Sequence, residues 1–269
     1  IRPPARFPVR GIFARSSFCY HAYMRKILGI IPARLRSTRL PKKLLLPIDG
    51  KPLLYHTWRQ ARQASRLDRL LIATDSKEIY RAAKAFGADP VMTSRSCPTG
   101  SDRVAEAARA FKDFIPDIVV NIQGDEPLIP PEAIDACVTA LLANRDVPMA
   151  TVAAPLSFAE SRKDSVVKVV CDTRGRALYF SRSRIPYPRA PYGGYLRHIG
   201  LYAFRLPFLF DYVRLPQTPL EIAESLEQLR VLEHGYMIQV AMGDFPTIGI
   251  DTLSDLRRFR KLSAMAGTA

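Results

Sequence analysis

Short apolar runs alternate with helix-like segments through the first half of the chain, and this alternation is the feature that most restricts the fold. The predicted strands are Ile27–Ile31, Arg69–Thr74, Val91–Thr93 and Asp117–Ile122. The predicted helices run from Pro52 to about Ser65, from Asp75, a candidate N-cap, to Phe86, from Ser101 to Lys112 and from Pro131 to about Ala143. Strands separated by helices of this length are joined by crossover connections, which make them parallel. We therefore expect an α/β fold built on a mainly parallel sheet.

The pattern changes after residue 148, where strand-like runs follow one another with short connections. These runs are Met149–Leu156, Val166–Cys171, Ala177–Ser181 and Arg197–Arg205. They indicate a more antiparallel region added to the sheet. Pro219–His234 is predicted to be one amphipathic helix, because its apolar residues fall on a single stripe. The stripe consists of Leu220, Ala223, Leu226, Leu229 and Leu232. A strand at Met237–Ala241 and a final helix after Thr252 complete the prediction.

A dense group of cations follows the first predicted strand. The strand is broken at Pro32, and the next eleven residues contain Arg34, Arg36, Arg39, Lys42 and Lys43, together with Ser37 and Thr38. Open α/β sheets bind ligands at the carboxyl ends of their strands. Like charges on one loop repel one another unless an anion joins them, and Arg and Lys bind phosphate oxygens strongly. Neither GxxxxGK[ST] nor GxGxxG occurs in the chain. The loop therefore indicates a nucleoside triphosphate bound without a Walker loop.

Two acidic residues follow apolar runs in the same way. Asp125 comes after the strand that ends near Ile122, with Gly124 before it, and such a position suits a ligand of Mg²⁺, which takes one or two carboxylates plus phosphate oxygens. The alternative is that Asp125 caps the next helix or turn. Asp251 follows Ile248–Ile250 and by itself is best read as an N-cap. Paired with Asp125 it becomes a second carboxylate on the same ion, and both interpretations stay open.

Other polar residues also have a structural and a functional interpretation. A lone histidine in a strand-like run, such as His198, is more often structural than catalytic, and Arg182 and Arg184 are equally compatible with a solvated loop. Glu227 and Gln228 interrupt the helical stripe, and a solvated helix face is the default interpretation.

The segment Thr99–Arg103 precedes a predicted helix. Ser101 is a candidate N-cap there, and the same loop is a candidate contact to a nucleobase. Physical reasoning alone favours the capping interpretation.

The charge of the chain raises the question of nucleic-acid binding. The formal net charge is +15 and the pI is about 10.0. However, eleven Lys or Arg residues precede the first acid, Asp49, and the others are scattered among acids without an interleaved aromatic stripe. We therefore expect an anionic small-molecule substrate and no nucleic acid.

Cysteine spacing and hydropathy bear on the environment of the protein. The four cysteines are widely separated and form no CxxC pair, so neither a disulfide framework nor a zinc site is indicated and a cytoplasmic protein is expected. No apolar stretch approaches the roughly 18 residues that span a bilayer, so no stable membrane insertion is expected. Residues 1–23 are rich in Arg and contain no acid, as in transit peptides. We favour Met24 as the natural start and residues 1–23 as a disordered tail or upstream extension.

A set of motifs in fixed order resembles one enzyme family. The motifs are IIPARxxSTRLPxK from Ile30, ATD at Ala73–Asp75, TGSDR at Thr99–Arg103, VNIQGDEP at Val120–Pro127, RHIGLY at Arg197–Tyr202, LEQLR at Leu226–Arg230 and GIDTxxDL at Gly249–Leu256. Together they resemble the CMP-Kdo synthetases, the 3-deoxy-manno-octulosonate cytidylyltransferases. The resemblance extends over essentially residues 24–262.

The resemblance implies transfer of a cytidylyl group from CTP to the anomeric hydroxyl of Kdo, giving CMP-Kdo and diphosphate for lipopolysaccharide. The alternative is a related acidic sugar, 8-amino-Kdo or sialic acid. The implied fold is a Rossmann-like nucleotidyltransferase, a three-layer α/β/α sandwich with a mixed, mainly parallel sheet and a smaller antiparallel insertion. A homodimer is implied as well. We expect one domain over residues 24–269, with a nucleotide-binding part at about 24–148 and a sugar-binding and dimerisation part at about 149–247.

The same motifs imply roles for individual residues. Triphosphate contacts are expected from Arg34, Ser37, Arg39 and Lys43, and cytosine contacts from Ala33 and Arg103. Asp125 and Asp251 would hold Mg²⁺, and with Arg34 and Lys43 they form the expected catalytic group. The sugar-acid pocket would be lined by Gln123, Arg182, His198, Tyr202, Glu227 and Gln228. A carboxylate sugar and a triphosphate repel each other, and the cations and Mg²⁺ would offset this repulsion and stabilise the leaving diphosphate. No dedicated general base is expected.

Overall fold

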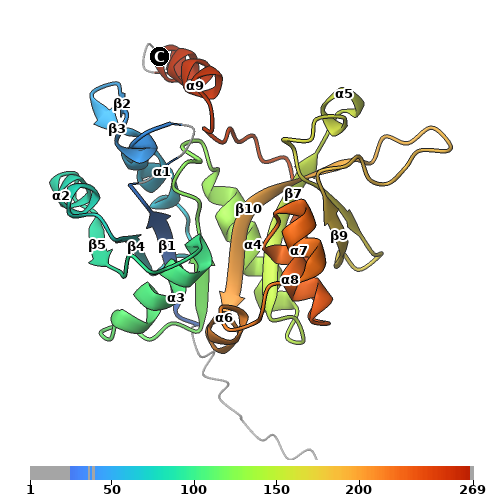
Figure 1. Ribbon diagram of the computed structural model, residues 1–269, viewed down its shortest axis with the longest axis horizontal. Helices are drawn as coiled ribbons and strands as arrows, with labels where there is room; N and C mark the ends of the chain where they lie inside the picture. The colour runs from blue at the N-terminus through green and yellow to red at the C-terminus, as the bar shows by residue number, and fades with distance from the viewer. Residues whose placement is uncertain (1–24, 36, 38–39, 267–269) are drawn as a thin grey trace, which may run out of the picture.

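A single twisted sheet runs through the centre of the molecule (Figure 1). The computed structural model describes residues 25–35, 37 and 40–266. Within these residues the main sheet has nine strands, seven of them in the order β11-β7-β10-β6-β1-β4-β5. The strands are β1 (Ile27–Ala33), β4 (Arg69–Thr74), β5 (Asp89–Met92), β6 (Ile118–Asn121), β7 (Met149–Pro155), β8 (Lys168–Cys171), β9 (Ala177–Ser181), β10 (Leu196–Arg205) and β11 (Ile238–Met242). A separate two-stranded sheet pairs β2 (Pro47–Ile48) with β3 (Lys51–Pro52).

The directions of the strands confirm the predicted mixture. β5, β4, β1 and β6 are mutually parallel, and β11 is parallel to β7. The ten-residue strand β10 lies antiparallel between β6 and β7. β8 and β9 form an antiparallel pair joined to the beginning of β10, which is the predicted antiparallel addition.

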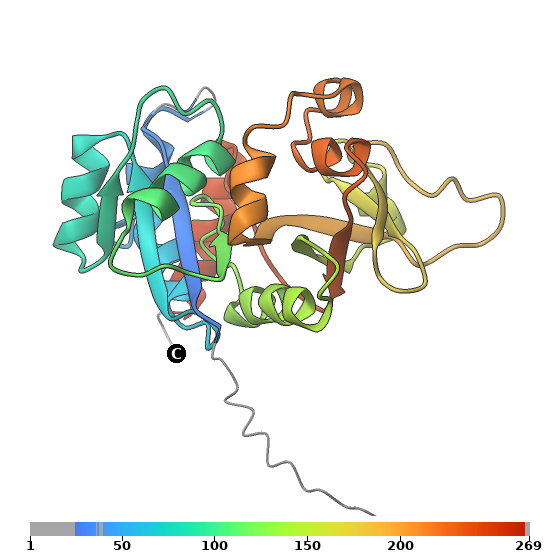
Figure 2. The same cartoon turned by 90° about the horizontal axis from the view of Figure 1, so that it is seen from below.

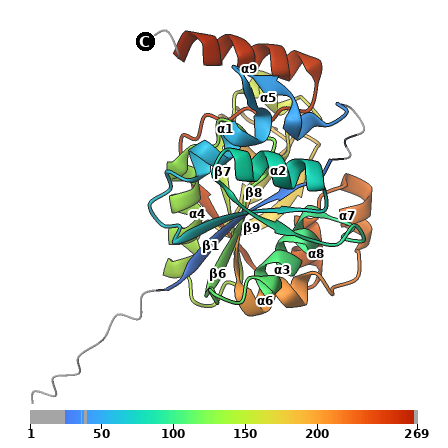
Figure 3. The same cartoon turned by 90° about the vertical axis from the view of Figure 1, so that its left-hand side faces the viewer.

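Helices cover both faces of the sheet, which gives the predicted α/β/α layers (Figures 2 and 3). The helices are α1 (Leu53–Ala61), α2 (Lys77–Ala85), α3 (Gly100–Ala110), α4 (Pro131–Ala143), α5 (Phe158–Ser161), α6 (Leu206–Tyr212), α7 (Pro219–Glu224), α8 (Gln228–Glu233), α9 (Leu253–Ala266) and the 3-10 helix η1 (Lys43–Leu45). Apolar residues of α1, α2, α4 and α9 fill one core, and those of α3, α6 and α8 fill the other. Among the described residues no helix is long and apolar enough to cross a membrane.

Two predicted helix caps are wrong by one or two residues. Ser76, not Asp75, caps α2, because its hydroxyl accepts a hydrogen bond from the backbone of the third helical residue. Thr99, not Ser101, caps α3, and it exchanges hydrogen bonds with Asp102 in a capping box. The helix starts earlier than predicted, so Ser101 lies in its first turn with its side chain available for another contact.

The predicted helix Pro219–His234 is also wrong, because the chain breaks it into α7 and α8. Ser225 between them has a φ of 52°, a left-handed conformation that ends the first helix. The break changes which side faces inward: Leu220 and Ala223 are exposed, whereas Glu221 and Arg230 are buried. An apolar stripe therefore did not identify the buried face, because a charged pair occupies part of it.

Candidate active site

A cavity of about 1010 Å³ lies at the carboxyl ends of β1 and β6. Eleven of the predicted site residues line it: Arg34, Ser37, Lys43, Arg103, Gln123, Asp125, Arg182, Tyr202, Glu227, Gln228 and Asp251. They come from nearly the whole length of the chain. This is the edge of the sheet at which α/β proteins bind ligands.

Lys43 joins the two predicted metal ligands. Its ammonium lies 2.5 Å from Asp125 Oδ2 and 3.0 Å from Asp251 Oδ1. Burial lowers the pKa of Lys43, but the charges and hydrogen bonds of the two aspartates outweigh it and leave this pKa raised. The lysine is therefore a permanent cation between two carboxylates.

The backbone fixes the two aspartates relative to each other. The Ile250 N–H donates to the Asp125 carbonyl at 2.9 Å, so the chain before Asp251 is bonded directly to the turn after β6. The partly buried Glu126 carboxylate accepts a hydrogen bond from the Thr247 hydroxyl and adds a second link. Burial raises the pKa of Glu126.

Gly124 permits a close approach of chains next to Asp125. A Cβ there would lie 3.2 Å from the Pro32 carbonyl oxygen and 3.3 Å from Leu44 Cδ1. The Thr57 hydroxyl donates to the Gly124 carbonyl at 2.9 Å and holds the turn from below. Any larger residue would push this turn away from the end of β1.

Asp251 does not cap the last helix. Thr252 and Asp255 exchange the hydrogen bonds of a capping box at the start of α9, with Thr252 N–H donating to Asp255 Oδ2 at 2.8 Å and Asp255 N–H donating to Thr252 Oγ1 at 3.2 Å. The Asp251 carboxylate faces Lys43 instead. The alternative that Asp251 acts as a simple cap is therefore wrong.

The pair of carboxylates fits a magnesium ion. Their oxygens already share one cation, the Lys43 ammonium, between them. Within the part of the chain that the structure describes, no cluster of three or more His, Cys, Asp or Glu could hold a metal. Mg²⁺ is commonly held by one or two carboxylates and completes its shell with water and substrate phosphates. Two carboxylates suit an ion whose other ligands are water and nucleotide phosphates better than an ion that is held by protein ligands alone.

The basic loop is described in part. Arg34 is exposed and Ser37 half-buried, and both line the cavity. Lys42 also lines the cavity, and its ammonium forms an ion pair with Glu78 at 2.9 Å. Arg39, predicted to bind the triphosphate, lies outside the described residues.

Arg103 is built into the wall beside this loop. Its guanidinium is buried, donates to the Thr93 hydroxyl at 2.5 Å and lies 3.6 Å from Asp75 Oδ1. These contacts fix its place at the start of α3. Ala33, predicted to lie near cytosine, is a fully buried residue of β1 whose neighbours Pro32 and Arg34 line the cavity instead.

Two buried polar atoms of cavity-lining residues have no hydrogen-bond partner among the described residues. They are Asn121 Oδ1 at the end of β6 and Gln228 Nε2 at the start of α8. The Tyr202 hydroxyl donates to the other end of the Gln228 amide at 3.1 Å and orients it. Buried polar groups are almost always paired in native proteins, so these atoms indicate ligand contacts. Asn121 was missed from the sequence, although a polar residue in a buried strand was a usable signal.

Glu227 also lines the cavity. Its Oε2 accepts the Ser101 hydroxyl at 3.0 Å, a contact across 126 residues of chain, and burial raises its pKa. Ser101 therefore joins the first turn of α3 to the start of α8. Neither Glu227 nor Gln228 is on a solvated helix face.

Arg182 is anchored to α7. Its backbone N–H donates to Glu224 Oε2 and its Nε–H to the Glu224 carbonyl, both at 2.9 Å. The fully buried Lys168 ammonium donates to the Arg182 carbonyl from the other side. The arginine reaches the cavity from a segment whose backbone is fixed at two points.

His198 does not line the cavity, unlike the other predicted sugar contacts. It is buried, lies 2.9 Å from the Thr151 hydroxyl and packs edge-on against Phe180. Burial lowers the pKa of His198 to about 3, so the ring is neutral at physiological pH. Its ring lies 5.5 Å from that of Tyr202, which does line the cavity. Its position favours a supporting role.

A mixed sheet with a basic loop after β1 and two aspartates at its carboxyl edge defines a nucleotidyltransferase-like α/β protein. A family profile described as cytidylyltransferase matches residues 28–239. The chain is 45% identical over 245 residues to the 3-deoxy-manno-octulosonate cytidylyltransferase of Protochlamydia amoebophila, covering 88% of this chain and 95% of that protein. It is 48% identical over 235 residues to that of Syntrophobacter fumaroxidans, covering 86% and 94%. The chain belongs to the family of 3-deoxy-manno-octulosonate cytidylyltransferases, and it is an enzyme of the nucleotidyltransferase class.

Solved structures agree with this assignment. One described as CMP:2-keto-3-deoxy-manno-octonic acid synthetase complexed with CTP matches with a TM-score of 0.84 and 40% identity, covering 90% of this chain and 99% of that one. The 4-diphosphocytidyl-2C-methyl-D-erythritol synthase of Anaerococcus prevotii matches with a TM-score of 0.60 and 15% identity, covering 90% and 99%. The second match shows the fold alone.

Proposed function

We propose that this protein transfers the cytidylyl group of CTP to 3-deoxy-D-manno-octulosonate, giving CMP-Kdo and diphosphate for lipopolysaccharide. The observation that carries the proposal is the meeting of Lys43, Asp125 and Asp251 at one edge of a cavity that also contains the basic loop. Support also comes from the relatives, whose names describe this reaction, and from a similar structure described as a complex with CTP.

In the proposed reaction the anomeric hydroxyl oxygen of the sugar attacks the α-phosphorus of CTP. The bond from that phosphorus to the bridging oxygen breaks, diphosphate leaves and the hydroxyl proton passes to water. Arg34, Ser37 and Lys43 hold the triphosphate and stabilise the charge that grows on the leaving group. The sequence motif assigns the same contact with the triphosphate to Arg39. Positioning and electrostatics supply most of the rate enhancement in transfers of this kind.

Asp125 and Asp251 would hold Mg²⁺ beside the triphosphate. The ion would supply charge neutralisation on the phosphate oxygens. Lys43, which pairs with both carboxylates in this structure, would supply a further positive charge for the triphosphate. Gln123, Arg182, Tyr202, Glu227 and Gln228 form the proposed sugar subsite, with Asn121 added by its unpaired carbonyl oxygen.

Diphosphate release tests the reaction directly. The protein is incubated with CTP, Kdo and Mg²⁺, and release is followed with a coupled pyrophosphatase assay. Activity that vanishes with EDTA and returns with Mg²⁺ supports the metal proposal. Absence of Kdo-dependent release at any Mg²⁺ concentration rejects the function.

A substrate panel decides between acidic sugars. Kdo, 8-amino-Kdo and sialic acid are compared at equal concentrations with the same assay. The proposal expects the highest kcat/KM with Kdo. A preference for either of the other sugars keeps the chemistry and changes the substrate.

We also propose a homodimer. Support comes from large apolar side chains that stay exposed on β9, in the loop before β10 and on α7, namely Leu178 (61%), Tyr187 (78%) and Ile222 (62%). Exposed apolar groups of this kind are frequent at protein interfaces. Light scattering coupled to size-exclusion chromatography measures the mass, and a value near 30 kDa rejects the dimer.

A further inference from the structure

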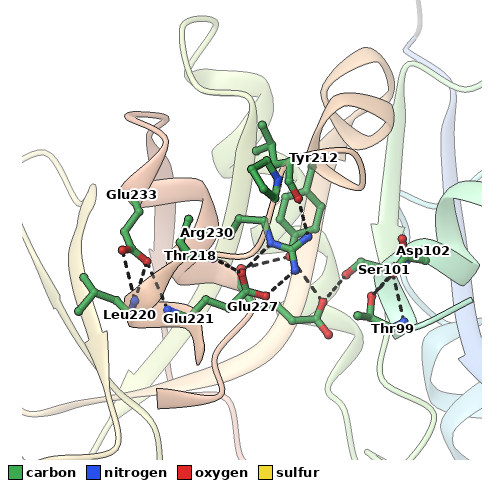
Figure 4. A network of polar contacts seen from close by, with 12 residues as sticks. Thr99, Ser101, Asp102, Tyr212, Thr218, Leu220, Glu221, Glu227, Arg230 and Glu233 are labelled. Carbon is green, nitrogen blue, oxygen red and sulfur yellow. Dashed lines mark hydrogen bonds and ion pairs between the residues drawn. The ribbon is translucent and has the colours of Figure 1, made fainter. Parts of the chain in front are cut away.

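The turn that carries Glu227 and Gln228 is held by a buried ion pair behind it. In Arg230, Nε–H donates to Glu221 Oε2 at 2.7 Å and one terminal N–H to Glu221 Oε1 at 2.5 Å (Figure 4). Glu221 belongs to α7 and Arg230 to α8, so the ion pair links the two helices on either side of Ser225. Two parallel hydrogen bonds of this kind fix orientation as well as distance.

Tyr212 connects the Glu221–Arg230 pair to Glu227. The Arg230 guanidinium lies over the Tyr212 ring, 5.4 Å from its centre. The Tyr212 hydroxyl donates to the Glu227 carbonyl at 3.2 Å and lies 3.5 Å from Glu227 Oε2 (Figure 4). The Ser101 hydroxyl reaches the same oxygen from α3. The Glu227 carboxylate is therefore held from the sides of α3 and α6, and the backbone beneath it from α7 and α8.

Arg230 is not among the residues that line the cavity. Its side chain and that of Glu221 are 8% and 4% exposed. Removing two charges from water is costly, and apolar residues of similar volume often stabilise a protein equally well. We therefore interpret the buried Glu221–Arg230 pair as a contact that fixes the orientation of the turn with Glu227 and Gln228, rather than as a source of stability.

We infer that Arg230, acting through Glu221 and Tyr212, is a positioning residue that fixes Glu227 and Gln228 for the acidic sugar. It contacts neither substrate. The inference rests on the proposed function, because it assigns the turn to the sugar and not to CTP. Loss of the pair lets the turn move, and misplacement by about 1 Å can reduce a rate 10²-fold.

The pair also affects the charge of Glu227. Burial raises the pKa of Glu227, while the Ser101 hydrogen bond and the charge of Arg230 lower it. The other charged or titratable groups that face it are Asp102 from α3, Glu221 from α7, Tyr202 from β10 and Tyr212 from α6. Removal of the Arg230 charge raises the pKa of Glu227 further, so its carboxylate becomes protonated at a higher pH.

The test compares Arg230→Met and Arg230→Lys with the wild type in the full reaction with CTP, Kdo and Mg²⁺. For Arg230→Met we expect kcat/KM for Kdo to fall about 10- to 100-fold, with a higher KM for Kdo, while KM for CTP changes less than about threefold and the acid limb of kcat/KM for Kdo moves to higher pH. Arg230→Lys retains the charge without the two parallel hydrogen bonds, so it restores the acid limb but only part of the affinity. Tyr212→Phe removes one hydroxyl, and we expect a threefold to tenfold rise in KM for Kdo.

Arg214→Met is the matched control, because Arg214 pairs with Asp211 at the surface and is 71% exposed. It should leave both KM values unchanged. If the Arg230→Met variant does not fold, the Tyr212→Phe and Arg230→Lys variants test the inference. Unchanged KM for Kdo in both, or equal changes for Kdo and CTP, overturns the inference. An inactive wild type would reject the proposed function instead, so the two failures are distinguishable.

Discussion

Lys43 and Asp251 are 208 positions apart in the chain, and the ammonium of the first lies 3.0 Å from the carboxylate of the second. The contact brings together the beginning and the end of the folded chain at the cavity. Asp125 completes the arrangement from the middle of the sequence. One ammonium between two carboxylates leaves a net charge of −1 on this group, which the proposed Mg²⁺ would offset beside the triphosphate.

Asp125→Asn should nearly abolish activity and preserve the fold. The amide keeps the shape of the side chain but loses the charge that Lys43 and the proposed metal require. Electrostatic stabilisation by a metal ion is worth several kcal/mol, so kcat should fall about 10²-fold or more. Diphosphate release measures kcat, and circular dichroism checks the fold.

Asp89→Asn is the control for this substitution. Asp89 is exposed and lies 3.9 Å from Lys84 at the edge of the sheet, away from the cavity. The activity of the Asp89→Asn variant should match that of the wild type. Near-normal turnover of the Asp125 variant would remove that residue from the metal site.

Thr99→Ala should destabilise the protein by about 1 kcal/mol, because it removes the cap of α3. Thr99→Ser should be close to the wild type, since serine caps equally well. Urea unfolding curves measure both. Equal stability of the alanine and serine variants would contradict the capping box.

Gly124→Ala should destabilise the protein by about 1–3 kcal/mol, because the new methyl group meets the Pro32 carbonyl oxygen and Leu44. The turn after β6 would shift, so activity should fall as well. Gly193→Ala offers a comparison, since a Cβ at that position meets no atom within 4 Å. Equal urea midpoints for the Gly124→Ala and Gly193→Ala variants would contradict a close contact at Gly124.

His198 should make folding sensitive to acid. Its folded pKa, lowered by burial to about 3, is below the unfolded value of about 6.5, so the unfolded chain binds the extra proton. The contribution of neutral His198 is fully present above pH 6.5 and is lost as the pH falls toward 3, by up to about 1.4 kcal/mol per pH unit. His198→Gln should show a smaller loss of unfolding free energy between pH 6.5 and 5. Parallel pH curves for the two proteins would contradict the assignment.

Local sequence patterns predicted most of the strands and helices. Arg69–Thr74 and Ala177–Ser181 have the predicted bounds, and the helix that begins at Pro131 ends at Ala143 as expected. These elements are long enough, or bounded clearly enough by Pro and Gly, for neighbouring residues to determine them. The caps at Ser76 and Thr99 were missed because several hydrogen-bonding residues stand next to each other, and backbone geometry chooses among them.

The sequence by itself determined the α/β class, the basic loop and the acidic residues at strand ends, because these depend on periodicity and on local composition. Tertiary structure alone decided that Lys43 joins Asp125 to Asp251, that His198 lies behind the cavity wall and that Ser225 breaks the helix. It also decided that Glu221 and Arg230 face inward. Distances between residues far apart in the chain, and the pairing that makes a buried charge tolerable, arise only when the sheet brings those segments together.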